Sequence, residues 1–335
     1  MTPSRGSRAP VPQSDLTRFR IGTRASALAL KQARMVQAAL DVQGITSELV
    51  TFTTIGDKRL DEPLSAIGGK GLFTTEIEHA LRRGKVDCAV HSLKDLSTDS
   101  APELDVVAVL PRADPRDVLV LSSTARAVGL ADLPRGSRVG TSSLRRRAQL
   151  LAVYPDFEVV ELRGNVPTRL RKVDEGQVHA AILAAAGLHR LDATQHISAY
   201  LDAPDWLPAA GQGAIAIQTR VDDGVARGAV GALNHEQTMF AVRAERAFLA
   251  GLEGGCQVPI GALAIEQDGR AGPVWTLYGL IAEPGGRRVI RGTRVIGADP
   301  LAAGRALADE LRSRGADDIL TALRGVTRVV SPQPE

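Results

Sequence analysis

Two short segments of the chain occur twice, in the same order, and this repetition constrains the fold more than any other feature of the sequence. Residues 20–23 (RIGT) return as residues 138–141 (RVGT), and residues 84–90 (GKVDCAV) return as residues 176–182 (GQVHAAI). Each segment alone is short enough to recur by coincidence, but the shared order indicates two similarly built lobes. Ligands of open α/β lobes bind beyond the carboxyl ends of the strands, so we expect a cleft between the lobes.

Strand and helix patterns alternate through the first two thirds of the chain. A short strand and turn at 19–23 lead into an Ala- and Leu-rich helix, and 49–54 is a second strand. The helix expected over 75–83 begins with Thr-x-x-Glu, which matches a capping box, and 86–90 has the composition of a buried strand. This order predicts parallel sheets with crossover helices.

The last third of the chain has a different pattern. A helix expected at 237–249 is broken by the glycines of the run 251–256, Gly-Leu-Glu-Gly-Gly-Cys. Three strands and two closing helices are then expected at 260–265, 275–282, 288–295, about 300–314, and 317–323. Strands grouped together and followed by helices predict an α+β domain.

These patterns predict an α/β protein of three domains, with two α/β lobes around a cleft and a smaller α+β C-terminal domain. The expected limits are 18–112 plus 213–232 for domain 1, 116–208 for domain 2 and 233–330 for domain 3. Prolines at 111–115 and 204–208 mark the expected crossings between domains. Residues 1–17 carry no apolar stretch and are expected to be a disordered tail, with a short organellar targeting segment as the alternative.

Composition and charge narrow the class of protein. The chain has 44% hydrophobic and 24% charged residues, as ordinary globular proteins do, and its net charge of +3 argues against a dedicated nucleic-acid binder. No apolar run is long enough to cross a bilayer. The two cysteines, Cys88 and Cys256, do not suggest a disulfide framework, so a cytoplasmic location is expected.

The strongest chemical signal is the run 140–147, Gly-Thr-Ser-Ser-Leu-Arg-Arg-Arg. A strand that ends at Thr141 meets the start of a helix, so backbone N–H groups, two serine hydroxyls and the guanidiniums of 145–147 surround one point. Such a point binds phosphate or carboxylate. The alternative is an ordinary helix cap with a solvated basic face, but arginine in a first turn opposes the helix dipole and gains nothing without an anion.

Further cations and hydroxyls occur in both lobes, and many of them follow predicted strands, where the cleft should be. They are Arg24, Ser26, Lys94, Arg163, Arg169, Arg171, Lys172 and Arg190. Any one of them alone is more often a solvated surface charge. Like charges left unpaired at one place repel each other by up to about 4 kcal/mol per close pair. The shared location therefore predicts a polyanionic ligand.

Asp95 and Cys256 are the candidate reactive groups. Asp95 follows a buried strand beside Lys94, where the pair is either an ion pair of little value or a source of acid, base or cation-stabilising chemistry. Neighbouring arginines favour the ionised form of Asp95. Free cysteine is most often a small buried residue, whereas the glycines before Cys256 and Pro259 after it indicate a shaped loop that presents a nucleophile or attachment point. Cys88 lies in an apolar strand and is interpreted as structural.

Residues 68–71, Gly-Gly-Lys-Gly, resemble a phosphate loop only superficially, because the GxxxxGK[ST] pattern is absent. Three glycines in four residues instead indicate a mobile segment or lid, with Lys70 as its cation.

Taken together, these motifs resemble the porphobilinogen deaminase family over nearly the whole chain, from about Arg20 to the C-terminal helices. The resemblance is carried by GTRxS at 22–26, GGKGLF at 68–73, HSLKD at 91–95, GTSSLRR at 140–146, RGN at 163–165, GQG at 211–213 and LEGGCQVP at 252–259. It implies three domains, of which two resemble periplasmic-binding-protein lobes and the third carries a cysteine on a loop facing the cleft.

The resemblance also implies a transferase that joins four porphobilinogen molecules head-to-tail, releases ammonia and yields hydroxymethylbilane for tetrapyrrole biosynthesis. It implies a dipyrromethane cofactor bound covalently to Cys256 by a thioether, Asp95 as the essential carboxylate, and no metal. The positions that match carboxylate-binding residues are Arg24, Ser26, Ser92, Lys94, Thr141, Ser143, Arg145, Arg146, Arg163, Arg169 and Arg190. Lys70 and Phe73 match a basic residue and an aromatic residue of the active-site loop. The expected partner is porphobilinogen, with no nucleic acid and no membrane, and a monomer is expected.

Two positions depart from the family pattern: Ala66 stands where many relatives have a second lysine, and Ser97 stands where proline is common. The non-enzyme alternative is a two-lobed solute-binding or effector-sensing protein, which needs neither Cys256 nor a third domain. An anion-dependent phosphotransferase is the other alternative. The missing phosphate-loop pattern and the missing metal-ligand cluster count against it.

Overall fold

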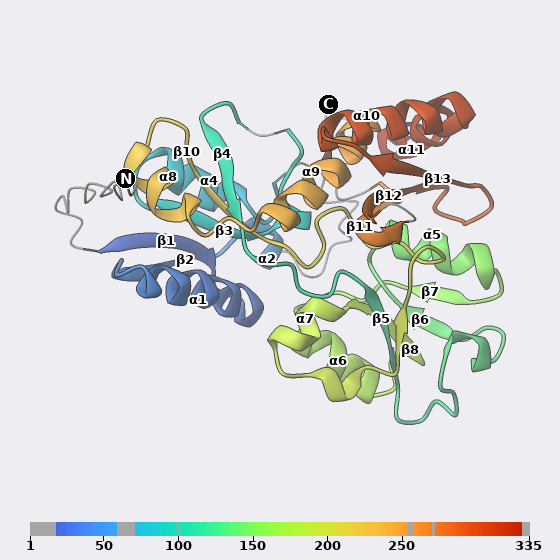
Figure 1. Cartoon of the computed structure of the whole chain (residues 1–335). Coiled ribbons are helices and arrows are strands. Elements are labelled where there is room, and N and C mark those ends of the chain that lie inside the picture. The colour runs from blue at the N-terminus through green and yellow to red at the C-terminus, as the bar shows by residue number, and fades with distance from the viewer. Residues whose placement is uncertain (1–17, 59–70, 100, 254–257, 270–271, 330–335) are drawn as a thin grey trace, which may run out of the picture.

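Three β-sheets organise the part of the chain that the computed structural model describes (Figure 1). That part comprises residues 18–58, 71–99, 101–253, 258–269 and 272–329, of which 324–329 are described by their backbone alone. Sheets 1 and 2, with the helices packed on them, form lobes 1 and 2; in Figure 1, lobe 1 is blue to cyan with its residues 215–231 in yellow, and lobe 2 is green to yellow-green. Sheet 3 and its helices, in orange and red, form the C-terminal domain.

The first two sheets have the same strand topology. In each, three parallel strands are followed by one antiparallel strand and by an edge strand that runs antiparallel to its neighbour. In spatial order, sheet 1 is β2 (Ser47–Phe52), β1 (Phe19–Arg24), β3 (Cys88–Ser92), β10 (Ile215–Arg220) and β4 (Leu104–Val109). Sheet 2 is β7 (Glu158–Val160), β6 (Arg138–Gly140), β8 (Ala180–Ala184), β5 (Asp117–Leu121) and β9 (Ala199–Leu201).

The repeated sequence segments occupy equivalent places in these two sheets. The first repeat forms β1 and β6, and the second repeat ends in β3 and β8. A side-chain contact is repeated as well, because the Arg20 backbone N–H donates to Asp87 Oδ2 (2.7 Å) and the Arg138 N–H donates to His179 Nδ1 (2.8 Å). The prediction of two similarly built α/β lobes is confirmed.

Polar side chains cap the helices that follow the equivalent strands β1 and β6. α1 (Ala27–Val42) begins after Ser26, whose Oγ accepts from the Ala29 N–H, and α5 (Leu144–Val153) begins after Ser143, whose Oγ accepts from the Arg146 N–H. Such caps satisfy backbone donors that have no partner within the helix. The remaining helices of the two lobes are α2 (Ile55–Lys58), α4 (Thr75–Arg82), α6 (Val166–Asp174), α7 (Ala185–Arg190) and α8 (Gly224–Gly231).

The prediction of a capping box at 75–78 is wrong. Thr74 is the N-cap of α4, and it makes no side-chain cap bond. The Thr75 hydroxyl donates to Gly71 O (2.8 Å), while the Glu78 carboxylate accepts from Gln218 Nε2 (3.2 Å) on β10. Glu78 therefore joins α4 to sheet 1 instead of closing the start of its own helix.

The C-terminal domain packs helices against one three-stranded antiparallel sheet. Its strands are β11 (Ile260–Gly269), β12 (Gly272–Ala282) and β13 (Val289–Ile296), and its helices are α9 (Glu236–Gly251), α10 (Pro300–Leu311) and α11 (Asp317–Val329). Phe248, Leu307 and Leu311 are fully buried in its core. No helix in the described part of the chain has the length and the apolar character needed to cross a membrane.

The chain passes between the first two sheets twice, over 110–116 and over 202–214, and a buried ion pair joins both passages to the C-terminal domain. Arg112 donates from Nη1 to Glu245 Oε1 (2.6 Å) and from Nη2 to Glu245 Oε2 (3.0 Å), and the Gly211 N–H donates to Glu245 Oε2 (2.7 Å). Glu245 lies on α9 and is completely buried. These bonds place α9 against the crossings, which lie near the expected ones, whereas the domain limits themselves stay a prediction.

Candidate active site

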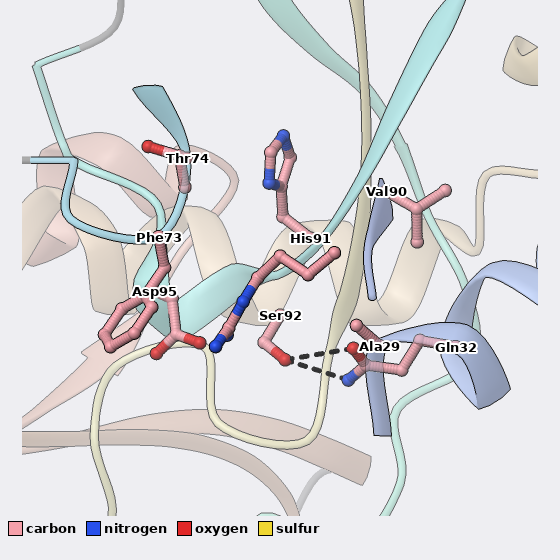
Figure 2. A pocket seen from close by; sticks show the side chains of 9 residues that line it. Ala29, Gln32, Phe73, Thr74, Val90, His91, Ser92 and Asp95 are labelled. Atoms are coloured by element: carbon pink, nitrogen blue, oxygen red, sulfur yellow. Dashed lines mark hydrogen bonds between the residues drawn. The ribbon is translucent and has the colours of Figure 1, made fainter. Parts of the chain in front are cut away.

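A pocket lies at the carboxyl ends of β1 and β3 (Figure 2). Its lining comprises Arg24, Ala29, Gln32, Phe73, Thr74, Val90, His91, Ser92 and Asp95. Four of the residues expected from the sequence, Arg24, Phe73, Ser92 and Asp95, are therefore brought together in lobe 1. The strand ends supply them because Arg24 closes β1 and Ser92 closes β3.

Arg24 is held in this pocket by an acidic residue that the sequence did not reveal. Its guanidinium forms an ion pair with Asp57 of α2, and its central carbon lies 4.4 Å from the centroid of the Phe73 ring. Burial by itself would raise the pKa of the Asp57 carboxyl, but hydrogen bonds from Arg24 and Thr54 outweigh burial and lower it. The ion pair with Asp57 thus indicates that the Arg24 guanidinium is placed so that it can bind a carboxylate.

Ser92 is fixed by Gln32, a second residue that sequence reasoning missed. Gln32 Nε2 donates to Ser92 Oγ (2.9 Å), and the two side chains are linked by the dashed lines in Figure 2. Gln32 is buried on the face of α1 that also buries Ala29 and Val36. A polar residue within the apolar stripe of an amphipathic helix was the signal that could have found it.

His91 is not a cation of this pocket. Burial lowers its pKa to about 4, and its Nε2 lies 3.2 Å from Gln218 Oε1. The imidazole is therefore neutral near neutral pH.

Asp95 ends a short 3₁₀ turn, Leu93–Asp95, that follows β3 directly. Burial lowers the pKa values of Lys94 and Arg169, and the negative charge of Asp95 opposes this lowering, so the carboxylate lies within electrostatic reach of cations from both lobes. No described residue donates a hydrogen bond to it. This carboxylate is therefore able to interact with a ligand's N–H groups or with positive charge that develops on the ligand.

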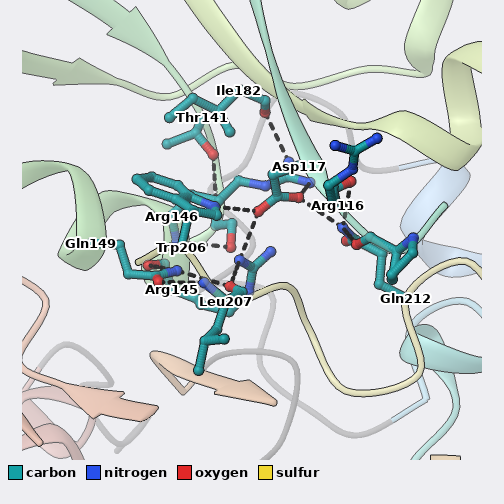
Figure 3. Close-up of polar contacts among 12 residues, drawn as sticks. Arg116, Asp117, Thr141, Arg145, Arg146, Gln149, Ile182, Trp206, Leu207 and Gln212 are labelled. Carbon is teal, nitrogen blue, oxygen red and sulfur yellow. Dashed lines mark hydrogen bonds and ion pairs between the residues drawn. The ribbon is translucent and has the colours of Figure 1, made fainter. Parts of the chain in front are cut away.

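Arg145 and Arg146 share a buried carboxylate, Asp117, at the start of β5 (Figure 3). Arg145 Nη1 donates to Asp117 Oδ2 (2.7 Å) and Arg146 Nη2 donates to Asp117 Oδ1 (2.7 Å). Trp206 Nε1 and Gln212 Nε2 also donate to the same carboxylate, each at 2.8 Å. Burial would raise the pKa of Asp117, but Arg145 and Arg146 hold it far below its ordinary value.

Two guanidiniums share one carboxylate here, so this cluster keeps an excess positive charge. Arg146 Nη1 donates to Ile182 O (2.8 Å), but its buried Nε has no hydrogen-bond partner among the described residues. A buried donor without a partner is costly, and a ligand acceptor would satisfy it.

Gln212 connects this cluster to the pocket of lobe 1. Its Nε2 donates to Asp117 of lobe 2, and its Oε1 accepts from Lys94 Nζ (3.2 Å) of lobe 1. Gln212 is almost fully buried within the second crossing segment. Lys94, next to Asp95 in the chain, is thereby placed near the two arginines, and its pKa is lowered to about 8 by burial and by the charge of Arg146.

Three further arginines expected from the sequence lie on lobe 2. Burial lowers the pKa values of Arg169 and Arg190, each to about 10, so both keep their charge at neutral pH. The positive charges of Arg146 and Arg163 also lower the pKa of Arg169. Arg190 Nη2 donates to Gly213 O (2.6 Å), while its buried Nε has no hydrogen-bond partner in the part of the chain that the structure describes.

The hydroxyl groups of Ser26, Thr141 and Ser143 organise the starts of α1 and α5. Ser26 and Ser143 cap these helices, and Thr141 Oγ1 accepts from the Ser143 N–H (3.2 Å). A hydroxyl that accepts one hydrogen bond still has a proton to donate, so all three remain suited to a carboxylate ligand.

Lys70 and Cys256 lie outside the described residues, as does Ala66. Leu252, Glu253 and Val258, on either side of the cysteine segment, are described. Within the described ranges, no group of His, Cys, Asp and Glu side chains could hold a metal ion.

The fold and the pocket together define a two-lobed α/β protein whose site suits a ligand with several negative charges. Two solved structures have similar lobes: a periplasmic substrate-binding protein of an ABC transporter from Coxiella burnetii (15% identity, 68% of this chain, 96% of that chain, TM-score 0.41) and an R. palustris protein with adipate (15% identity, 68% and 83%, TM-score 0.42). Similarity at this level is a likeness of fold alone and says nothing about the ligand.

The chain belongs to the porphobilinogen deaminase family. Residues 19–227 match the model for the porphobilinogen deaminase dipyrromethane cofactor binding domain, and residues 239–313 match the model for the C-terminal domain. The porphobilinogen deaminase of Syntrophobacter fumaroxidans is 49% identical over 307 residues (90% of this chain, 96% of the relative), and that of Geobacter sulfurreducens is 48% identical over 309 residues (91% and 94%). The enzyme of this family polymerises porphobilinogen into hydroxymethylbilane in tetrapyrrole biosynthesis.

Proposed function

We propose that this chain performs the family reaction with Cys256 as the attachment point of the dipyrromethane cofactor, Asp95 as the catalytic carboxylate, and the cations of both lobes as the carboxylate-binding groups. The observation that carries the proposal is the convergence of Asp95 with Arg24, Lys94 and Arg169, which come from two lobes. When bound, the cofactor supplies the pyrrole carbon to which the first substrate is added.

The described residues fit a cofactor and a growing chain of this kind. Each pyrrole unit carries an acetate and a propionate, so the chain is a polycarboxylate. Within the described ranges, the buried Nε atoms of Arg146 and Arg190 have no hydrogen-bond partner, and charge-assisted bonds to carboxylates are the interactions such donors prefer. Arg24, Ser26, Ser92, Thr141, Ser143, Arg145, Arg163 and Lys70 complete the proposed set.

Asp95 has an electrostatic role in this proposal. Loss of ammonia from porphobilinogen leaves an electron-poor carbon. A carbon of another pyrrole attacks it, so the attacking ring becomes positively charged and is neutral again once it loses the proton of that carbon. A fixed carboxylate near the pyrrole N–H groups stabilises this charge in both steps. Phe73, which lies against Arg24, offers an aromatic face beside the pyrroles.

The proposal also covers the cellular location of the protein, its oligomeric state and its partner. We infer a cytoplasmic monomer whose partner is the small molecule porphobilinogen, without nucleic acid or membrane. The net charge of +3 and the cysteine content support this inference.

The attachment at Cys256 is tested by intact mass. The purified protein should carry a covalent excess of two pyrrole units, located in the peptide with Cys256, and should release ammonia from porphobilinogen. Cys256→Ser should lack both the excess mass and the activity. Cys88→Ala is the matched control and should keep both, because the Cys88 thiol is fully buried and burial raises its pKa. An unmodified mass in freshly made, active protein would refute the attachment.

The lowered pKa of Lys94 leads to a pH prediction. Lys94 binds carboxylates as an ammonium, so this contribution is present below pH 8 and is lost as the pH rises through its pKa of about 8. The ratio kcat/KM, which reports ionisations of the free enzyme, should therefore fall between about pH 7 and 9. Lys94→Arg keeps its charge throughout this range and should flatten that fall. A profile that is unchanged in Lys94→Arg would assign the fall to another group.

The non-enzyme alternative, a solute-binding protein with two lobes, predicts reversible binding of anions without turnover. Ammonia release from porphobilinogen by the purified protein separates the two, because a binding protein releases none.

A further inference from the structure

The Asp95 carboxylate accepts no hydrogen bond from any described residue, so its position depends on the backbone of residues 93–97. On one side of this segment the Leu93 N–H donates to Ala214 O (3.1 Å), and the Leu96 N–H closes the 3₁₀ turn on Leu93 O (3.2 Å). On the other side the segment leaves the pocket through Ser97. What holds the backbone after Asp95 therefore decides where the carboxylate points.

Arg246 holds that side of the segment. Its Nη1 donates to Leu96 O (3.0 Å) and its Nη2 donates to Ser97 O (2.7 Å), which are the two carbonyl groups directly after Asp95. Two N–H groups of one planar guanidinium fix both the distance and the orientation of the peptides they bind. A turn of the segment about its axis would break at least one of these bonds.

The turn at Ser97 has its own local support. The Ser97 hydroxyl accepts from the Asp99 N–H (3.2 Å), which keeps the Ser97 carbonyl in a defined place although the family's usual proline is absent. Arg246 therefore binds an ordered pair of carbonyls.

Arg246 lies on α9, which also carries Glu245 and ends at Gly251, shortly before Cys256 in the chain. Glu245 binds Arg112 of the first crossing and the Gly211 N–H of the second. Adjacent residues of one helix thus hold the segment with Asp95 and both crossings. α9 therefore connects the backbone that positions the Asp95 carboxylate to the chain segment that leads to Cys256.

We propose that Arg246 is a positioning residue for Asp95, which acts across the boundary between lobe 1 and the C-terminal domain. This proposal rests on the proposed function of Asp95. A misplacement of about 1 Å can cost a reaction about 100-fold in rate, because electrostatic stabilisation depends on geometry. Since Arg246 acts through Asp95, its loss should lower kcat while substrate binding by the cations of the pocket persists.

The test compares Arg246→Met, Arg246→Lys and Arg243→Met in the full-length holoenzyme. Arg243→Met is the matched control, because Arg243 is one turn away on α9 and exposed to solvent. Arg246→Met should lower kcat for ammonia release by about 10- to 100-fold, with KM changed less than about twofold and the covalent adduct retained. Arg246→Lys should restore part of kcat, because an ammonium still reaches one of the two carbonyls, and Arg243→Met should match the unmodified enzyme.

An unchanged kcat in Arg246→Met, or a raised KM with an unchanged kcat, would overturn the proposal. If Arg246→Met does not fold, Arg246→Lys decides: a lower kcat at constant KM supports the proposal, and an unaltered kcat contradicts it. Combining the Arg246 substitution with Asp95→Glu should give a loss smaller than the product of the two single losses, and a full product would mean that Arg246 acts independently of Asp95. Absence of ammonia release from the unmodified holoenzyme would instead contradict the proposed function itself.

Discussion

Asp95→Asn is expected to lower kcat by about 100- to 1,000-fold while the covalent two-pyrrole adduct remains in place. The substitution keeps the size of the side chain and removes its negative charge, so the site loses the carboxylate that we propose to stabilise developing positive charge. The cations that we propose to bind carboxylates are unchanged, because no described residue depends on Asp95 for a hydrogen bond. KM should therefore change little compared with kcat.

The measurement is ammonia release from porphobilinogen at saturating substrate, together with the intact mass of the purified variant. Asp222→Asn is the matched control, since Asp222 is an exposed residue of lobe 1 (84% of its side chain) and its loss removes the same charge away from the pocket. Full activity in Asp95→Asn would remove Asp95 from the mechanism. A missing adduct would show that Asp95 acts already in the assembly of the cofactor.

Asp117→Asn is expected to lower the free energy of unfolding by about 3–5 kcal/mol and to lower the fraction of the protein that acquires the covalent cofactor. The Asp117 carboxylate is completely buried and accepts from Arg145, Arg146, Trp206 and Gln212. An amide offers fewer acceptor sites and places its own N–H groups against those donors. Two buried guanidiniums are then left next to each other without the charge that compensates them.

Urea unfolding of the unmodified and substituted proteins measures this loss, and intact mass measures the fraction that carries the adduct. Asp192→Asn is the matched control, because Asp192 is an exposed aspartate (81% of its side chain) of lobe 2 that pairs with Lys31 across the lobes. Exposed ion pairs contribute little to stability, so this control should stay close to the unmodified protein. A loss below about 1 kcal/mol in Asp117→Asn would contradict the view that the carboxylate holds the two arginines.

The amino-acid sequence alone was enough to predict the two lobes, the C-terminal domain and the family. The repeats at 20–23 and 138–141 predicted equivalent strands, because the residues of a strand and those of the turn after it are adjacent in the sequence. The residues that point to chemistry, Arg24, Asp95 and Thr141, could be placed at strand ends for the same reason. The local sequence pattern gave a wrong prediction at Thr75: the capping motif is present, but the Glu78 side chain accepts a hydrogen bond from a distant strand.

Only the tertiary structure decided which partner each cation has. Arg24 pairs with Asp57, Arg145 and Arg146 share Asp117, and Gln212 reaches Lys94 across 118 residues of sequence. Arg246 bonds to the segment after Asp95 across about 150 residues. No periodicity or spacing encodes such pairs, because they arise when separate elements pack and most of their buried polar groups find partners on other elements. The sequence specifies the charges of this site, and folding specifies which of them remain for the ligand.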